Sequence, residues 1–370
     1  MLQVTPALDA GGVEQATLDM AGAVARLGRR SLVASRGGRL EEVLAERGGE
    51  LVRIPMDVKN PISVAANGTR LTAVVRREKV SLIHVRSRAP AFSAWLAARA
   101  TGAPMVATYH GIYSARSGLK RWYNAIMTRG DAVIANSDFT RRHIVAEHGI
   151  DPDRIALVPE GVDTDRFDPG AVSPERVAAM RAAWGLAADD SRIVILMAAR
   201  LAGWKGHEIL AKAFERLPNR DRAVLVMTNA TDGSPLAMSL AAVCPTARLV
   251  GECSDMPAAF LAADLVVAPS TQAESFGRSV VEAGAMGRPV LASALGAHAE
   301  TIAVGETGWL APPGDVAAWT AALDTAASAS AETRAAMGRA AHARATRLYS
   351  LPAMYAGTFA VYRRVLEDRR

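Results

Sequence analysis

The stretch Arg192-Ile193-Val194-Ile195-Leu196-Met197-Ala198-Ala199-Arg200 contains one of the longest apolar runs in the chain. A loop with two glycines, Gly203 and Gly206, follows it and leads into a segment with helical character over 208–216. A short, continuous apolar run that passes through a glycine loop into a helix is typical of a strand buried in a parallel sheet. The pattern predicts a strand over 192–198 and a helix behind it.

The same alternation of short apolar runs and helical segments fills both halves of the chain. The expected strands lie at 2–6, 31–34, 50–54, 81–85, 105–109 and 132–135, then at 192–198, 223–228, 247–249, 265–268 and 289–292. The expected helices lie at 13–27, 64–78, 91–100, 208–216, 256–262, 276–286 and 316–327. This order predicts an α/β protein with two doubly wound, Rossmann-like domains, whose ligands bind in the cleft at the carboxyl ends of the strands.

A polar stretch over 159–170, punctuated by proline and glycine, separates the two patterns and is typical of an interdomain linker. We therefore expect an N-terminal domain over 1–168 and a C-terminal domain over 169–351. A last helix is expected over 352–367, where apolar residues recur at helical spacing. From the residues alone, that helix closes the second domain or crosses back to the first.

The composition is that of a folded globular protein. The chain has 370 residues, enough for two hydrophobic cores; half of them are hydrophobic and 22% are charged. No apolar run approaches the roughly 20 residues that span a bilayer, and the first residues lead directly into a strand instead of a signal peptide. We therefore expect a cytoplasmic protein. Cys244 and Cys253 form no CxxC motif and are expected to be buried thiols.

The net charge of +6 is unevenly distributed, with +5 over residues 1–168 and +1 over the remainder. A basic first half favours anionic lipid headgroups, a phosphorylated acceptor or nucleic acid as partners. It is equally typical of an arginine-rich soluble surface. The chain has no aromatic and basic motif of the usual nucleic-acid modules, so we expect no nucleic-acid partner.

The strongest functional motif runs from Glu274 to Glu282. It follows an expected strand, and Phe276 and Gly277 lie where a helix should begin, so free backbone N–H groups are available there for an anion. The two carboxylates could hold two hydroxyl-rich groups while the amides between them hold phosphate. A nucleotide sugar has that order of groups. The pattern alone fits equally well an N-terminal helix cap followed by an ordinary surface glutamate.

Two cations lie in the loop that ends the opening stretch. Arg200 and Lys205 flank a glycine-containing turn between a strand and a helix, a place that suits a diphosphate. Surface cations in loops are also common, so the motif leaves both interpretations open.

The first half carries two weaker motifs. Gly11 and Gly12 follow the first strand, and a backbone without side chains can approach a ligand closely at a helix N-terminus. The motif is not GxGxxG, which argues against a dinucleotide. His110 ends the strand over 105–109 and could contact a sugar or a leaving group, or could be structural.

Two further stretches allow more than one interpretation. The segment 115–124 combines Arg116, Lys120 and Arg121 with Trp122 and Tyr123, which suits an acceptor, a membrane surface or a solvated helix face. The stretch 163–165 matches the DXD pattern of metal-dependent sugar transferases. It lies in the linker without a strand before it, so we expect no metal there.

Taken together, these motifs resemble the family-4 retaining glycosyltransferases of the GT-B fold, and among them the group that assembles bacterial lipopolysaccharide and surface polysaccharide. The similarity spans almost the whole chain. It is carried by Gly11-Gly12, His110-Gly111, Ala135-Asn136-Ser137, the stretch 159–168, Arg200 with Lys205-Gly206, Glu274 to Glu282, and Gly296 with Glu300.

The resemblance implies a role for each motif. Arg200 and Lys205 would neutralise the donor diphosphate, Glu274 would bind the transferred sugar, and Glu282 the ribose. The amides of Phe276 and Gly277 would lie beside the donor.

In the first domain, the resemblance places His110 near the reacting sugar and Gly11-Gly12 opposite the phosphates or the acceptor. The last helix would cross back to this domain.

The resemblance further implies a UDP- or GDP-sugar donor and a lipid-linked saccharide or polysaccharide acceptor. Transfer would proceed with retention and without a metal or other cofactor, the leaving phosphate activating the acceptor. The enzyme would contact the inner face of an anionic membrane through its basic N-terminal domain. Ser275 and Arg278 depart from the family pattern, and Arg278 would add a cation near the donor, which leaves the donor sugar open.

Two alternatives remain. One is another GT-B activity, a sugar-nucleotide epimerase or a phosphorylase. The other is a non-catalytic nucleotide-sugar-binding subunit of an assembly complex.

Overall fold

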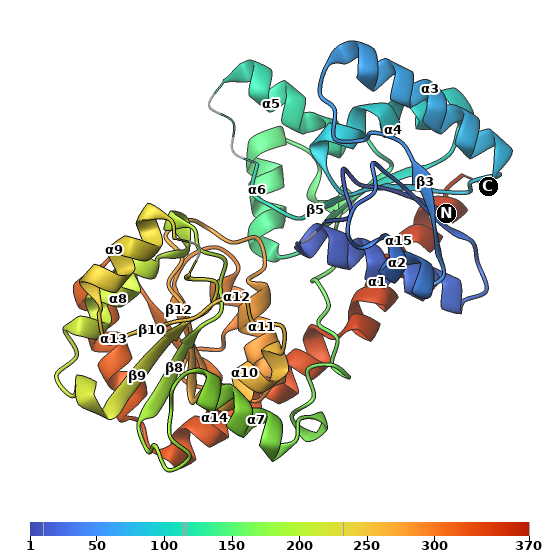
Figure 1. The fold of residues 1–370 in the computed structure, drawn as a ribbon. Coiled ribbons are helices and arrows are strands. Elements are labelled where there is room, and N and C mark those ends of the chain that lie inside the picture. The colour runs from blue at the N-terminus through green and yellow to red at the C-terminus, as the bar shows by residue number, and fades with distance from the viewer. Residues whose placement is uncertain (10, 114, 116, 232, 370) are drawn as a thin grey trace. The chain divides into compact units, whose positions relative to one another are not determined.

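The computed structural model describes residues 1–9, 11–113, 115, 117–231 and 233–369. The chain forms two compact units, one made of Met1–Gly161 and Leu351–Arg370 and the other of Val162–Ser350. Each unit is a parallel sheet with helices on both faces (Figure 1). The change from the first unit to the second falls inside the polar stretch 159–170.

The sheet of the first unit has seven strands in the described residues, in the order β3-β2-β1-β4-β5-β6-β7, and every neighbouring pair is parallel. The strands are β1 (Leu2–Val4), β2 (Ser31–Ser35), β3 (Gly49–Arg53), β4 (Ile83–Val85), β5 (Met105–Tyr109), β6 (Ala132–Ala135) and β7 (Ile155–Leu157). The central strands are buried along their whole length, as the continuous apolar runs predict.

Helices cover both faces of this sheet. One face packs against α1 (Gly12–Arg26), α2 (Glu41–Glu46) and α15 (Leu351–Glu367). The other packs against α3 (Pro61–Arg77), α4 (Arg88–Thr101), the 3-10 helix η1 (Ala125–Thr128) and α6 (Asp138–His148). The short helix α5 (Gly118–Asn124) precedes η1.

The second unit has a six-stranded parallel sheet in the described residues, in the order β10-β9-β8-β11-β12-β13. The strands are β8 (Ile193–Met197), β9 (Ala223–Met227), β10 (Arg248–Leu249), β11 (Leu265–Ala268), β12 (Val290–Ser293) and β13 (Gly308–Ala311). The opening stretch of the sequence is thus β8, next to the strand that leads to Glu274.

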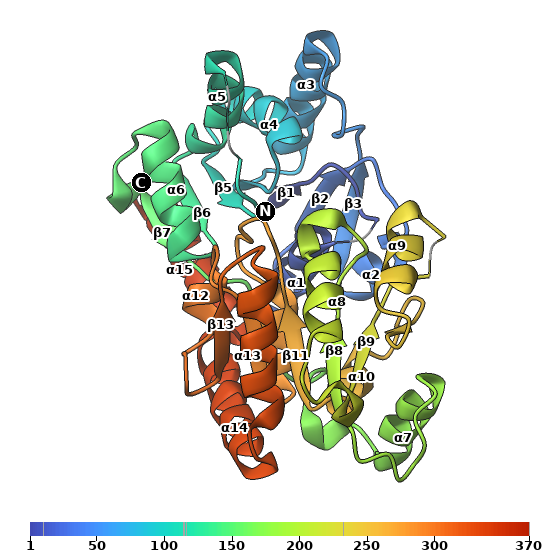
Figure 2. The same cartoon turned by 90° about the vertical axis from the view of Figure 1, so that its left-hand side faces the viewer.

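In this unit, α8 (His207–Glu215), α9 (Pro235–Val243) and α13 (Val316–Ser328) cover one face (Figure 2). The helices α7 (Pro174–Ala183), α10 (Met256–Ala262), α11 (Arg278–Ala285) and α14 (Ala331–Leu348) cover the other. The pair α11 and α14 packs through small residues. A Cβ on Gly338 would lie 2.0 Å from the carbonyl oxygen of Gly287, so the two backbones are in close contact.

The last helix, α15, belongs to the first unit, and this confirms the predicted crossing. Tyr362 of α15 and Thr108 of β5 both contact the buried ring of His84 on β4, at 2.5 Å from Nδ1 and 2.7 Å from Nε2. Burial lowers the pKa of His84 well below its ordinary value, because a charged ring at this position would have no water to solvate it. The helix is therefore fixed to the sheet by neutral hydrogen bonds as well as by apolar packing.

The architecture was predicted correctly, but several elements were not. The short strands β7 and β13 and the long helix α14 were missed. The helix expected from Phe276 begins at Arg278, because Gly277 adopts a left-handed conformation with φ of 83° and serves as its N-cap. In the described parts of the chain, no helix combines the length and the hydropathy that crossing a bilayer requires.

Candidate functional site

The carboxylate of Glu274 is the centre of a polar cluster in the second unit. Glu274 lies in the loop between β11 and α11, and its Oε2 is 2.9 Å from Nζ of Lys205. The hydroxyl of Ser270 donates to Oε1 at 2.5 Å. The side chains of Lys205 and Glu274 are 16% and 13% exposed, so this ion pair is mostly shielded from water. The structure therefore brings together two residues that the sequence placed in separate motifs.

Gly206 allows the two loops to meet. The loop that carries Lys205 ends at Gly206, whose φ is 81°, and a Cβ there would lie 1.9 Å from the carbonyl oxygen of Pro269. Only glycine combines that left-handed conformation with so close an approach. The amide of Thr271 also donates to the carbonyl of Trp204 at 2.8 Å. These contacts fix the loop after β8 against the loop after β11.

The surroundings of Glu274 favour its ionised form. Burial alone would raise the pKa of this carboxyl, but Lys205, His298 and Ser270 together lower it below the ordinary value. The ammonium of Lys205 also lies 4.4 Å from the centre of the Trp204 ring. Glu274 was expected to be free to bind a polyol. In the structure it is already paired, so a ligand has to compete for it or share its partners.

The N-terminus of α11 carries no side-chain cap, which leaves backbone N–H groups there available to an anion. The side chain of Phe276 is buried and packs edge-on against Tyr349, with ring centroids 5.6 Å apart, so only its backbone can contribute to a site. The carbonyl of Glu274 accepts a hydrogen bond from the amide of Ala297 at 2.9 Å. This start of a helix has the chemistry of a phosphate-binding site.

Glu282 lies on α11 and pairs with a residue of the same helix. Arg278 Nε is 3.0 Å from Glu282 Oε1, one turn along the helix. Arg278, which departs from the family pattern, thus has a partner on its own helix. Its guanidinium holds the carboxylate of Glu282, which was expected to bind ribose.

Arg200 follows β8 and is exposed. Within the described residues it makes no ion pair, unlike Lys205 five positions later. The exposed guanidinium of Arg200 is therefore available to an anionic ligand.

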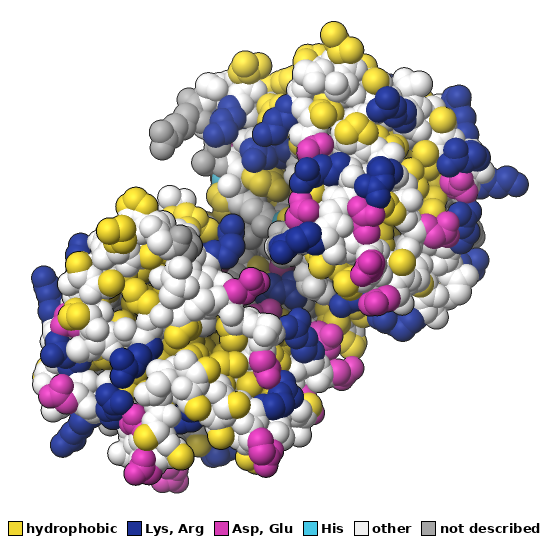
Figure 3. Space-filling model, viewed as in Figure 1, with side chains coloured by type: hydrophobic (Ala, Val, Ile, Leu, Met, Phe, Trp, Pro, Cys, Tyr) yellow, Lys and Arg dark blue, Asp and Glu magenta, His cyan; other side chains and the backbone are white. Residues whose placement is uncertain are grey.

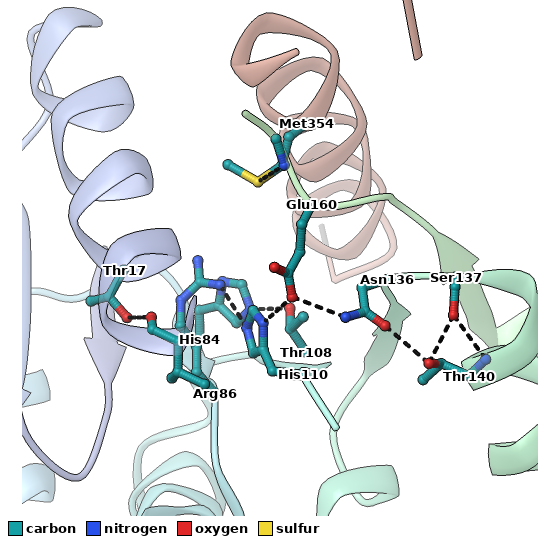
Figure 4. Close-up of polar contacts among 12 residues, drawn as sticks. Thr17, His84, Arg86, Thr108, His110, Asn136, Ser137, Thr140, Glu160 and Met354 are labelled. Atoms are coloured by element: carbon teal, nitrogen blue, oxygen red, sulfur yellow. Dashed lines mark hydrogen bonds and ion pairs between the residues drawn. The ribbon is translucent and has the colours of Figure 1, made fainter. Parts of the chain in front are cut away.

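His110 belongs to the first unit and lies in a separate buried network (Figure 4). Its Nδ1 is 3.0 Å from Glu160 Oε1, which also accepts a hydrogen bond from Asn136 Nδ2 at 2.9 Å. Its Nε2 is 3.2 Å from a terminal nitrogen of Arg86, a residue that is 3% exposed and donates to Gln3 Oε1 at 2.9 Å.

This pattern assigns the protonation of His110. A guanidinium has only N–H donors, so the ring nitrogen that faces Arg86 must be the acceptor. The other nitrogen then carries the proton and donates to Glu160. Arg86 and Glu160 thus hold His110 as a neutral ring in one orientation, which is the state suited to positioning a ligand.

The two glycines of the first unit lie beside this network. Gly11, with φ of 134°, precedes α1, which has no side-chain cap. A Cβ on Gly12 would lie 3.8 Å from Glu160 Oε2, so the start of α1 is adjacent to the partner of His110. The structure thereby groups Gly11, Gly12 and His110 in one unit, and Lys205, Glu274 and Glu282 in the other.

Within the described residues, no group of three or more His, Cys, Asp or Glu side chains could hold a metal ion. The DXD stretch forms a turn, in which Asp163 Oδ1 accepts from the amides of Asp165 and Arg166 at 3.2 and 3.1 Å.

The sequence interpretation missed three residues of these clusters. Glu160 follows β7, a strand that the apolar run 155–158 could have indicated. Arg86 directly follows an expected strand, as His110 does, and could have been chosen on the same ground. His298 lies inside the stretch from Gly296 to Glu300 and had no signal apart from its residue type.

Models of glycosyltransferase families match both halves of the chain. The model described as Glycosyltransferase Family 4 matches residues 10–166, and the model described as Glycosyl transferases group 1 matches residues 192–328. The D-inositol 3-phosphate glycosyltransferase of Mycobacterium tuberculosis is 35% identical over 213 residues. That match covers 54% of this chain and 41% of the relative, less than half of its length.

Solved structures share the fold along nearly the whole chain. A glycosyltransferase from Rickettsia africae superposes with a TM-score of 0.91 at 29% identity, covering 99% of this chain and 98% of its own. The Anabaena protein HepE, in complex with UDP-glucose, superposes with a TM-score of 0.82 at 22% identity, covering 97% and 99% of the two chains. At that identity HepE shows a common fold and no more. The two doubly wound units are therefore those of the GT-B fold.

Proposed function

This chain belongs to glycosyltransferase family 4, and on that premise we propose that it transfers a sugar from a nucleotide-sugar donor to a saccharide acceptor. The observation that carries the proposal is the ion pair of Lys205 and Glu274 beside the uncapped start of α11. A cation, a carboxylate and free backbone amides within one small region match the diphosphate and the hydroxyls of such a donor.

The donor is a UDP- or GDP-sugar. Lys205 and the amides at the start of α11 bind the diphosphate, and Arg200 adds an exposed cation to the same strand end. Glu274 binds hydroxyls of the transferred sugar, and Glu282, oriented by Arg278, binds the ribose diol. HepE, which shares this fold, forms a complex with UDP-glucose, so UDP-sugars are the first donors to test.

The reaction retains the anomeric configuration and uses no metal. As the bond to the diphosphate breaks, negative charge accumulates on the leaving oxygen, and Lys205 and the helix amides stabilise it. The leaving phosphate itself accepts the proton of the attacking hydroxyl. The role assigned to His110, which Arg86 and Glu160 hold in one orientation, is to position a substrate group and not to act as a base.

Ligand-dependent stability tests the donor site. Thermal unfolding is measured with UDP, GDP, ADP and the matching sugar nucleotides. We expect one nucleotide to raise the Tm in a concentration-dependent way, because a ligand that binds only the folded state stabilises it by mass action. At a concentration of about 100 times its Kd the gain is about 2.7 kcal/mol. If none of the nucleotides changes the Tm, the donor site is wrong.

The acceptor is a lipid-linked saccharide or a polysaccharide of the bacterial cell envelope, met at the inner face of an anionic membrane. The supporting feature is α5. Leu119 is 77% exposed and Trp122 54% exposed, and these two residues flank the exposed cations Lys120 and Arg121. Arg116 of the same motif lies outside the described residues. Figure 3 shows hydrophobic and basic side chains together over the end of the first unit that carries α5.

Vesicle binding tests this surface. We expect the chain to co-sediment with vesicles that contain phosphatidylglycerol, less so at high salt, and hardly with neutral phosphatidylcholine vesicles. The double variant Leu119→Ser/Trp122→Ser should bind anionic vesicles at least about tenfold more weakly, since burial of even one of these large apolar side chains contributes about 1.5 to 3 kcal/mol and tenfold corresponds to about 1.4 kcal/mol. Met238→Ser, which changes a side chain of the second unit that is 69% exposed, is the matched control. Equal losses in both variants would contradict the assignment to α5.

A further inference from the structure

A buried histidine lies next to the donor carboxylate. His298 is the first residue of α12 (His298–Thr301) and is 1% exposed. Its ring packs against Gly277 so closely that a Cβ on Gly277 would lie 2.6 Å from Cδ2 and 2.8 Å from Nε2. The ring therefore lies directly against the backbone at the start of α11.

One nitrogen of this ring faces Glu274 without bonding to it. His298 Nε2 is 3.7 Å from Glu274 Oε1, beyond hydrogen-bond distance but within reach of an ion pair. Nε2 has no hydrogen-bond partner among the described residues. Glu274 thus has two neighbours that can carry a positive charge, and in this structure it uses only Lys205.

Most of the other charged groups of this region are occupied elsewhere. At the start of α11, Arg278 pairs with Glu282. From α14, Arg344 donates to the carbonyls of Glu300 and Thr301, at the far end of α12. Besides burial, the charge on His298 depends on Glu274 and Lys205, and on the backbone of Ser293, which favours the protonated ring.

These two neighbours act in opposite directions. Burial lowers the pKa of His298, Glu274 opposes that shift, and Lys205 adds to it. With Lys205 held against Glu274, the carboxylate is already compensated and the ring stays neutral. If the ammonium moves away from Glu274, a buried carboxylate is left beside a buried imidazole, and a proton on the ring restores the pair.

We propose that His298 is a positioning residue that replaces Lys205 as the cationic partner of Glu274 when Lys205 engages the donor diphosphate. The ring takes one proton from solvent as the nucleotide binds and returns it on release. Glu274 then keeps its negative charge and its orientation toward the sugar while the ammonium of Lys205 binds the donor diphosphate. The inference rests on the proposed function only for the identity of the anion that draws Lys205 away.

The first test needs no nucleotide. The titration of His298 is followed by NMR of the histidine rings, of which the chain has seven, with His298→Gln used to assign the signal. In Lys205→Met the ring should titrate about one pH unit higher than in the wild type, a tenfold gain in proton affinity. Lys212→Met, which removes an exposed lysine of α8, should leave the titration unchanged. An unchanged titration in Lys205→Met overturns the proposal.

The second test measures protons on binding. UDP, GDP and ADP are each titrated calorimetrically in buffers that differ in ionisation enthalpy. For the nucleotide that binds, the wild type should take up as much as about half a proton at the pH midway between the free and bound titrations, which is the most that a shift of one pH unit allows, and His298→Gln close to none. Equal uptake by the two proteins overturns the proposal even though the donor site stands. Binding of none of the three argues against the donor site, and the NMR titration then decides on His298 alone.

Discussion

Replacing Lys205 with methionine is expected to lower kcat/KM for glycosyl transfer by a factor of about 10² to 10³, the effect typical of removing one electrostatic contact to a developing charge. Lys205 is mostly buried and lies 2.9 Å from Glu274, beside the start of α11. Methionine keeps the apolar stem that packs in the loop and removes only the ammonium. Initial rates with the donor identified by thermal unfolding measure the effect.

Glu274→Gln should lower the rate to a similar extent, because the amide has no charge and one accepting oxygen where the carboxylate has two, so an NH2 donor faces either Ser270 or the ammonium of Lys205. The double variant Lys205→Met/Glu274→Gln should lose much less than the product of the single effects, since both changes remove parts of one unit.

Controls separate this result from unfolding. Lys212→Met should retain full activity, and the Tm of each variant shows whether it is folded. Near-normal transfer by a folded Lys205→Met protein would refute the assignment of the donor site.

The sequence was sufficient for the architecture because both sheets are parallel and covered on two faces. Their central strands must then be continuous apolar runs, such as 193–197 and 265–268, which stand out from the surrounding helices. The edge strands β7 and β13 have three and four residues and are partly exposed, so they lack the continuous burial of the central strands. Both strands were missed, although the apolar run 155–158 could have indicated β7.

The helix α14 was missed for a different reason. Its buried residues are Gly338, Ala341 and Ala345, all of them small. Patterns of helical periodicity rely on large apolar residues, whereas this contact with α11 depends on close approach of the backbones. The sequence shows alanines on all sides of the helix and hides which face is buried.

The candidate site could be predicted in some of its residues but not in its pairings. Lys205, Ser270, Glu274 and His298 lie on three segments of the chain, and only the fold places these side chains around the carboxylate of Glu274. The same holds for Arg86 and Glu160, whose contacts with His110 join the ends of three strands. A sequence motif can identify a residue such as His110. The protonation state of that residue is set by neighbours, such as Arg86 and Glu160, that no sequence motif identifies.

Gly206→Ala is expected to have the second large effect, because it should destabilise the loop that carries Lys205 and displace it from its position in the donor site. The left-handed backbone at Gly206 resists any side chain, and the new Cβ would lie 1.9 Å from the carbonyl oxygen of Pro269. Strain of this kind costs about 1 to 3 kcal/mol, so urea unfolding should show a loss of that size. The loop must then move away from β11, and the ammonium of Lys205 moves with it.

The same variant should therefore bind the donor nucleotide at least about tenfold more weakly, because displacement of charged groups that hold a phosphate removes more than 1.4 kcal/mol of binding free energy. Gly203→Ala is the matched control in the same loop, since a Cβ at Gly203 meets no atom within 4 Å. It should change stability by only a few tenths of a kcal/mol. If Gly206→Ala binds nucleotide as the wild type does, the contact of the two loops does not place Lys205, and the geometry of the donor site must have another origin.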